Sequence, residues 1–337
     1  MKEALLYDKK EDKKVLCRLC GHRCIISDGK FGICNVRQNI EGALYTHSYG
    51  NLISANVDPI EKKPIFHLLP GSVSYSIATA GCNFRCDFCQ NWQISQKKEA
   101  DKLGITPIYT PPEKIVREAK HSGCKTISYT YTEPTIFFEY ALEIARPAKE
   151  DGLYNVFVTN GYMTKECLDM LKGLLDAANV DLKSFSEDYY HKTCGAHLEP
   201  VLESIEYMRK LNIWVEVTTL VVPGLNDSEE ELKKIASFLA GVDKTIPWHI
   251  SKFHPMYRLD NLPQTPFATL KKAYQIGKAA GLHYVYLGNV PGEGESTFCY
   301  NCNEVLIERI GYFVKRNIIK EGVCPKCKSK IAGIWKP

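Results

Sequence analysis

The feature that most constrains the fold is a regular alternation of helix-like and strand-like segments over residues 72–288. A strand-like run at 72–81 comes first, and six rounds of helix and strand follow it. Strands rich in Val, Ile and aromatic residues that alternate with helices are typical of a parallel sheet with right-handed crossovers. The sequence therefore predicts an α/β protein with six core strands and an expected seventh. We expect helices at 111–123, 134–152, 164–176, 199–212, 227–241 and 266–281, and strands at 125–131, 154–160, 177–183, 213–222, 245–255 and 282–288.

Length and charge leave several protein classes open and disfavour others. A chain of 337 residues that is 45% hydrophobic can bury one large core with small appendages, or two ordinary domains. The 43 basic and 39 acidic residues nearly balance and form no basic block, so we expect neither a membrane nor nucleic acid as partner. The start of the chain is too polar for a secretory signal, and no apolar run approaches the ~20 residues that span a bilayer. We expect a cytoplasmic protein.

The chain has fourteen cysteines, which is a large number for a protein without signs of secretion. In reduced compartments, grouped cysteines indicate metal sites or catalysis more than disulfides. Three cysteines stand alone, and the other eleven form three groups. The groups are Cys17, Cys20, Cys24 and Cys34; Cys82, Cys86 and Cys89; and Cys299, Cys302, Cys324 and Cys327.

The last group consists of two C-x2-C pairs on either side of an alternating stretch that predicts a hairpin. Two such pairs supply the four thiolates of a zinc ribbon, a closed and structural site. Zinc ribbons also dock nucleic acid, but this hairpin offers only Lys315, Arg316 and Lys320 as a basic set. We therefore expect a zinc ribbon with a structural role.

The first group has uneven spacing, and Gly21, Gly29 and Gly32 supply turns that let four sulfurs converge. Four cysteine ligands again indicate a closed site. Zinc is the preferred occupant, and an auxiliary iron–sulfur cluster is the alternative, since four cysteines hold either one. His22 lies between two of the cysteines and is more simply read as an exposed or locally bonded side chain than as a ligand.

The middle group, in the stretch GCNFRCDFCQNW, has only three cysteines and follows the strand-like run 72–81. Enzymes with a barrel of parallel strands have their active sites at the C-terminal ends of these strands. Three thiolates leave one position of a four-iron cluster open, and Phe84, Phe88 and Trp92 would shield that cluster from water. The alternative is a zinc site completed by a distant histidine, His47 or His67.

A C-x3-C-x2-C motif with an aromatic residue before its third cysteine resembles the radical S-adenosylmethionine (SAM) superfamily. The resemblance implies a partial (β/α)6 TIM-like barrel. It also implies that Cys82, Cys86 and Cys89 hold a 4Fe-4S cluster whose fourth iron binds the amino and carboxylate groups of SAM. One electron then cleaves SAM and yields a 5′-deoxyadenosyl radical. The cofactor-binding residues that the resemblance implies are Phe88, Thr132, Glu133, Asn160, Asp181, Lys183 and His254.

These assignments follow from short phrases at successive strand ends. YTEP resembles a segment that binds the SAM amino group, although Tyr131 and Thr132 replace its two glycines. VTNGY keeps Asn160, and Val158 stands where glycyl-radical activating enzymes place Asp. In DLKS the polar residues alternate and share one side of the strand, where Lys183 would meet the SAM carboxylate. Each of these residues also has an explanation that involves no cofactor. Asp181 and Lys183 would form an ion pair at the rim, Asn160 would stabilise a turn, and His254 would be an ordinary loop histidine.

Over nearly its full length the chain resembles the radical SAM enzyme of the AmmeMemoRadiSam system, a relative of pyruvate formate-lyase activating enzymes. The phrases that carry this likeness include CRLCGHRC, DPIEKKPIFHLLPG, AGCNFRCDFCQNWQIS and HISKFHP. It implies Memo-like and AMME-region partner proteins, and we expect an electron donor such as ferredoxin or flavodoxin. We predict a four-cysteine metal-binding segment at 1–70, a radical SAM core at 71–292 and a zinc-ribbon domain at 293–337.

Three functions remain in competition. The first is a radical SAM enzyme that modifies an unidentified small molecule, nucleoside or partner protein. The second is an activase that abstracts hydrogen from a glycine of a large partner enzyme. The third is a non-enzymatic zinc and iron–sulfur module that binds nucleic acid. Six residues are candidates to face the substrate: Glu216, Thr218, His249, Tyr286, Asn289 and Glu293. For Glu216 and Thr218 the alternative is that they are polar side chains that fill the barrel.

Overall fold

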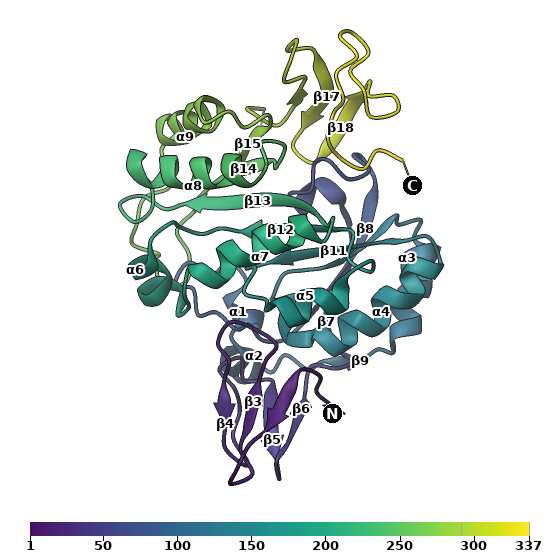
Figure 1. Ribbon diagram of the computed structural model, residues 1–337, viewed down its shortest axis with the longest axis vertical. Coiled ribbons are helices and arrows are strands. Elements are labelled where there is room, and N and C mark those ends of the chain that lie inside the picture. Colours follow the sequence, from purple (N-terminus) through teal and green to yellow (C-terminus); the bar gives the residue numbers. More distant parts are fainter. Residues whose placement is uncertain (291, 337) are drawn as a thin grey trace.

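The computed structural model describes residues 1–290 and 292–336, and the predicted alternation forms its central sheet (Figure 1). Seven strands of this sheet pair in parallel, which confirms the six core strands and the seventh. They are β8 (Val73–Thr79), β10 (Thr126–Tyr129), β11 (Tyr154–Thr159), β12 (Ala177–Asp181), β13 (Trp214–Val221), β14 (Trp248–Lys252) and β15 (Val285–Gly288). Most of their residues are buried, as expected for strands covered on both faces.

The predicted helices connect these strands. They are α3 (Pro112–His121), α4 (Phe138–Glu150), α5 (Lys165–Leu171), α7 (Glu199–Lys210), α8 (Glu229–Val242) and α9 (Phe267–Ala279). Helix α5 begins after Thr164, whose side chain accepts a hydrogen bond from the amide of Cys167. Helix α8 begins in the same way after Ser228, and three glutamates in its first turn complement the helix dipole. Local capping therefore places several helix starts where the sequence predicts them.

The sheet is open. Its strand order is β15-β14-β13-β12-β11-β10-β8-β7-β9, and among the described residues its edges β15 and β9 (Ile108–Tyr109) do not pair. Strand β7 (Asn51–Pro59) runs antiparallel to β8. Residues 51–59 thus belong to the central sheet, whereas the predicted boundary assigned them to the N-terminal segment. The reason is that β8 has an otherwise unpaired edge, which β7 covers with backbone hydrogen bonds.

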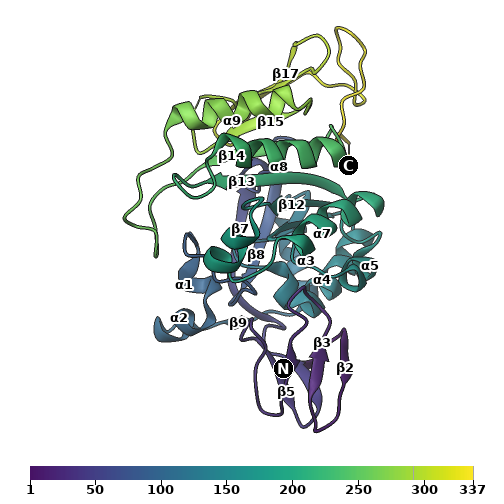
Figure 2. The same ribbon diagram turned by 60° about the vertical axis from the view of Figure 1, so that its left-hand side comes forward.

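Two small sheets precede the core and one follows it, at opposite ends of the molecule (Figure 2). The N-terminal strands are β1 (Lys2–Glu3), β2 (Tyr7–Lys9), β3 (Val15–Cys17), β4 (Ile25–Ile26), β5 (Arg37–Ile40) and β6 (Ala43–Thr46). The C-terminal strands are β16 (Thr297–Phe298), β17 (Val305–Ile310) and β18 (Phe313–Asn317), and the last two form the predicted hairpin. None of the helices in the described parts of the chain has the length and apolar character needed to cross a membrane.

Short helical turns complete the chain around the strand ends. They are η1 (Ile60–Lys62), α1 (Trp92–Ser95), α2 (Lys97–Lys102), η2 (Pro134–Phe137), α6 (Glu187–Tyr189) and the π-helical turn η3 (Tyr190–Cys194). Two of them border the middle cysteine group. The amide of Arg85 donates to the carbonyl of Cys194 and that of Asp87 to the carbonyl of Thr193, so the cysteine loop is fastened to η3.

Candidate active site

A cavity of about 580 Å³ lies at the carboxyl ends of the parallel strands. This is the edge at which parallel α/β proteins bind their ligands, because the loops after every strand meet there. All seven parallel strands contribute to it, either with their last residues or with the residues that follow them. Side chains of both charge signs line it, among them Glu133, Asp181 and Lys183.

Cys82, Cys86 and Cys89 line this cavity together, as predicted, with Phe84 and Phe88 buried beside them. Their sulfurs do not all lie within 4.8 Å of one another, a spacing that among the described residues only the C-terminal cysteines reach. Ligands of a single ion must converge on one point, whereas each thiolate of a four-iron cluster binds a different iron. The wider spacing therefore fits a cluster.

The alternative zinc site finds no support in the positions of the two candidate histidines. His47 bonds to Gln38, and His67 bonds to the carbonyl of Ala332 and the hydroxyl of Tyr286. Neither histidine lines the cavity. His67 is held by its hydrogen bonds in a separate buried polar network and does not belong to the surroundings of the three cysteines.

Lys183 and Asp181 both line the cavity, with Asp181 as the last residue of β12 and Lys183 two residues beyond it. Their Nζ and Oδ2 atoms are 3.0 Å apart, and the lysine Nζ lies 5.4 Å from the centroid of the Phe88 ring. Burial lowers the pKa of Lys183, but the neighbouring Asp181 carboxylate and the sulfurs of Cys86 and Cys194 together outweigh it, and the pKa of Lys183 is raised well above its ordinary value. A permanent cation thus lies next to the cysteine loop.

Glu133 is buried at the end of β10, where it ties two strand ends together. Its Oε1 accepts hydrogen bonds from Thr135 and from the hydroxyl of Thr159 at 2.7 Å, and its Oε2 accepts one from the amide of Asn160 at 2.8 Å. Burial nevertheless raises the pKa of Glu133. The carboxylate organises this rim of the cavity, and its direct contact with an amino group stays a prediction.

The backbone at Tyr131 adopts the conformation that glycine would supply. Its φ is +62°, in the left-handed region that a bulky residue takes only when its surroundings hold it. The hydroxyl of Tyr131 bonds to Asp58, and the Nζ of Lys63 lies 4.3 Å from its ring centroid. Replacement of the family's glycines by Tyr131 and Thr132 therefore leaves a glycine-like backbone path, and both residues line the cavity.

Asn160 lines the cavity and also shapes it. Its Nδ2 donates to Oδ1 of Asn83 at 2.7 Å, and its Oδ1 accepts from the amide of Tyr162 at 3.0 Å. The side chain of Asn160 therefore both stabilises the turn that follows β11 and links this turn to the cysteine loop. His254 differs, because it is half-buried beyond β14 and is not among the lining residues, so its contact with ribose stays a prediction.

Three of the six substrate candidates, Thr218, His249 and Asn289, line the cavity. Glu216 and Tyr286 lie outside its lining in a buried polar network, where Glu216 accepts a hydrogen bond of 2.7 Å from Nε2 of His249 and Tyr286 bonds to His67. The side chain of Glu293 is also outside the lining. The prediction missed a set of lining residues that precede the first parallel strand or belong to the C-terminal sheet: Glu61, Lys62, Lys63, Pro64, Phe66, Glu295, Gly311 and Tyr312.

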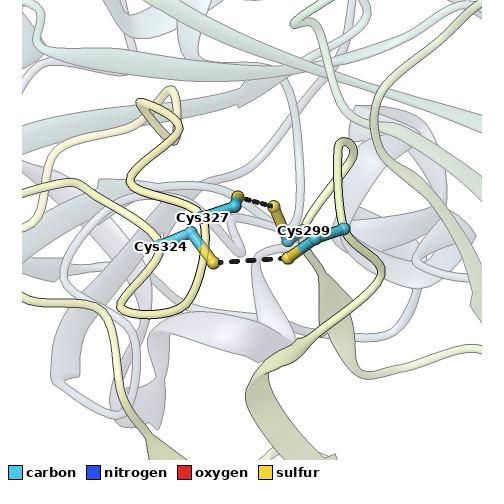
Figure 3. A group of neighbouring side chains, drawn as sticks. Cys299, Cys324 and Cys327 are labelled. Carbon is cyan, nitrogen blue, oxygen red and sulfur yellow. Dashed lines mark hydrogen bonds between the residues drawn. The ribbon is translucent and has the colours of Figure 1, made fainter.

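The four C-terminal cysteines form a compact group whose sulfurs all lie within 4.8 Å of one another. The sulfurs of Cys299 and Cys327 are 3.5 Å apart, and those of Cys302 and Cys324 are 3.7 Å apart. The dashed lines in Figure 3 mark these two contacts. These separations are far longer than a disulfide bond. Four converging thiols are a donor set that fits a tetrahedral metal ion.

Comparison with known proteins agrees with this geometry. The Radical SAM superfamily matches residues 76–239. An uncharacterized protein of Methanocaldococcus jannaschii is 46% identical over 337 residues, which span 98% of this chain and 99% of that protein. The pyruvate formate-lyase-activating enzyme of Staphylococcus epidermidis is 22% identical over 231 residues, 61% of this chain and 88% of the enzyme.

A likeness of fold is found in the crystal structure of Streptococcus suis SuiB bound to precursor peptide SuiA. Its TM-score is 0.52 at 13% identity, and the match covers 69% of this chain and 52% of that one. The superfamily match and the likeness to named activating enzymes agree with the cysteine loop at the carboxyl edge of the sheet, and this family implies SAM and an iron–sulfur cluster as cofactors. The chain belongs to the radical SAM superfamily and is a radical SAM enzyme similar to the pyruvate formate-lyase activating enzymes.

Proposed function

We propose that this enzyme cleaves SAM reductively to methionine and a 5′-deoxyadenosyl radical, which abstracts hydrogen from a small molecule or nucleoside. A 4Fe-4S cluster on Cys82, Cys86 and Cys89 would supply the electron for this cleavage. The observation that carries the proposal is the presence of all three cysteines, Lys183 and Glu133 on the lining of one cavity.

The residues around the cysteines suit a ligand with both an amine and a carboxylate. Lys183 offers a permanent positive charge beside the cysteine loop, and Asp181 limits the net charge of that wall. Glu133 and the left-handed backbone at Tyr131 belong to the lining as well, in the segment just after β10. Phe88 and Phe84 keep water from the cysteines, which strengthens charge interactions within the cavity.

The size of the cavity favours a small substrate. A volume of about 580 Å³ is in the range of small-molecule sites, and SAM itself would take part of it. Residues from outside the parallel core, including Phe66, Glu295 and Tyr312, form part of its lining and narrow access to it. A loop of a folded partner would have to displace them, whereas a small molecule would not.

An activase is the second candidate, favoured by the relatives that carry that name. It predicts a radical on a glycine of a partner protein after incubation with SAM and reductant. A glycyl-radical signal in electron paramagnetic resonance (EPR) spectra of such a mixture would establish it. The non-enzymatic nucleic-acid module is set aside, because the chain is a radical SAM enzyme. Zinc in the C-terminal cysteine group, Memo-like and AMME-region partners, and a cytoplasmic location stay proposals.

The test is anaerobic reconstitution with iron and sulfide, followed by addition of dithionite and SAM and quantification of 5′-deoxyadenosine. We expect product from the wild type and none above background from Cys86→Ala. Cys124→Ala is the matched control, since Cys124 is a buried cysteine outside the cavity lining and should leave the product yield in place. Absence of product from wild-type protein that holds a four-iron cluster would contradict the proposal.

A further inference from the structure

We propose that Cys17, Cys20, Cys24 and Cys34 hold a second iron–sulfur cluster, not zinc, and that this cluster passes electrons to the cluster on the middle cysteine group. The four thiols line one common cavity among the small N-terminal sheets. Leu19, Ile26 and Ile136 form apolar walls of the same cavity. Four thiols around an apolar space are a donor set for either type of metal centre, so the spacing of the sulfurs must decide between them.

Two other cysteine groups of the same chain can be compared with the N-terminal group. The C-terminal cysteines converge, with all four sulfurs within 4.8 Å of one another, as ligands of a single tetrahedral ion must. Among the described residues no three of the N-terminal cysteines reach this convergence. In this respect they match Cys82, Cys86 and Cys89, the cluster ligands of the superfamily. A cluster presents several irons at different points, so its thiolates stay apart even though they surround one cavity.

The polar groups around this cavity suit a cluster as well. Arg37 is 1% exposed, and its Nη1 lies 3.4 Å from Sγ of Cys17. The same guanidinium pairs with the buried carboxylate of Glu139, which fixes its position. Hydrogen bonds and positive charge near cluster sulfurs are what sets a cluster's reduction potential. Asn83 also lines the cavity, and its buried Nδ2 has no hydrogen-bond partner among the described residues, so it is available to a sulfide.

The position of the cavity gives the second cluster its role. Asn83 lines the four-cysteine cavity, and the preceding residue, Cys82, lines the active-site cavity, so adjacent residues of one loop separate the two sites. Nε2 of His22, between two of the N-terminal ligands, bonds to the backbone carbonyl of Asn83 at 2.8 Å. Ile33, another lining residue of the N-terminal cavity, is 40% exposed. The four-cysteine site thus has one lining residue at the surface and another in the loop that carries the middle cysteine group.

In the electron transfer that we infer, a reduced flavin or iron–sulfur protein would lose one electron to a cluster held by Cys17, Cys20, Cys24 and Cys34. That cluster would pass the electron to the cluster on the middle cysteine group and so return to its initial state. No bond forms or breaks in either step. The transfer rests on the proposed function, whereas the metal content of the N-terminal site does not.

The first test is the metal content of anaerobically purified and reconstituted protein. We expect iron beyond the about four atoms of one cluster, acid-labile sulfide to match, and about one zinc ion per chain. A Cys24→Ala/Cys34→Ala double variant should lose the excess iron and keep its zinc. A Cys82→Ala/Cys86→Ala/Cys89→Ala variant should lose the other iron and retain an EPR signal on reduction. Two zinc ions and a single cluster in the wild type would overturn the proposal.

The second test separates electron transfer from a structural role. Wild type and the Cys24→Ala/Cys34→Ala variant are assayed for 5′-deoxyadenosine with dithionite and, separately, with reduced flavodoxin. A relay predicts that the ratio of the flavodoxin-driven to the dithionite-driven rate falls in the variant. An equal loss with both reductants would overturn the relay. Failure of wild type with both reductants would instead contradict the proposed function, and the metal analysis would still stand.

Discussion

Acidification from pH 7 to pH 5 should destabilise the fold through His67, a fully buried side chain whose hydrogen bonds require a neutral ring. Its Nδ1 faces the carbonyl of Ala332 at 2.7 Å and must donate, so its Nε2 accepts from the hydroxyl of Tyr286 at 2.7 Å. The Tyr286 oxygen lies 2.8 Å from the hydroxyl of Thr297, whose oxygen accepts from Arg309. A proton on Nε2 would oppose the Tyr286 proton and force this chain of hydrogen bonds to rearrange.

Burial lowers the pKa of His67 to about 4, below the ordinary value of about 6.5. The folded state therefore resists protonation, and the unfolded state takes up the proton first. The contribution of His67 to the free energy of unfolding is fully present above about pH 6.5 and is lost as the pH falls from there toward 4. Between pH 7 and pH 5 the two values give a loss of about 2 kcal/mol in the free energy of unfolding.

Urea unfolding followed by tryptophan fluorescence measures this loss, because His67 lies against Trp214 and Trp335. The comparison is His67→Gln, which keeps a polar side chain but does not titrate. Its stability should be lower at pH 7 and should change less than that of the wild type between pH 7 and pH 5. Parallel pH dependences in the two proteins would refute the reasoning, since the acid sensitivity would then come from other groups.

Two further predictions concern Gly161, which follows the lining residue Asn160, and Tyr312, which belongs to the cavity lining. Gly161→Ala should destabilise the protein by about 1–3 kcal/mol more than Gly173→Ala in thermal unfolding, and should weaken SAM binding. Both glycines have positive φ, but only a Cβ at Gly161 would meet Val180, at 2.7 Å, so equal losses would contradict a steric origin. Tyr312→Ala should raise the KM for SAM, measured by the release of deoxyadenosine, by about tenfold. The neighbouring Phe313→Ala, outside the lining, is the control, and an equal KM change in both would contradict a direct contact.

The parallel core could be predicted because each of its signals is local. Strand composition, helix caps such as Thr164 and Ser228, and the spacing of the cysteines all lie within a few residues of the feature they specify. The residues that follow the strands could then be placed on one rim, since parallel strands bring their carboxyl ends together. The resemblance to the radical SAM superfamily implies Asp181, Lys183, Glu133 and Asn160, and their places just after or at the ends of successive strands put them on this rim.

The remaining part of the site depends on contacts that no local pattern encodes. Strand β7 joins the sheet because β8 offers a free edge, and the residues just after β7, including Lys63 and Phe66, are thereby carried to the cavity. Phe66 in turn contacts the C-terminal region, where Nη2 of Arg309 donates to its carbonyl at 2.8 Å. The C-terminal sheet is therefore held against the open side of the core by the same segment that lines the cavity.

This arrangement gives the C-terminal sheet a part in the active site beyond a structural one. Glu295 precedes β16 and Tyr312 lies at the turn between β17 and β18, and both line the cavity, whereas the four cysteines proposed to bind a metal lie in turns outside these strands. Loss of the metal would unfold the turns that carry Cys299 and Cys302, since converging thiols without an ion have little else to order them. The position of Tyr312 would then change with the metal content. Removal of the metal should for this reason affect the KM for SAM before it affects the cluster on the middle cysteine group.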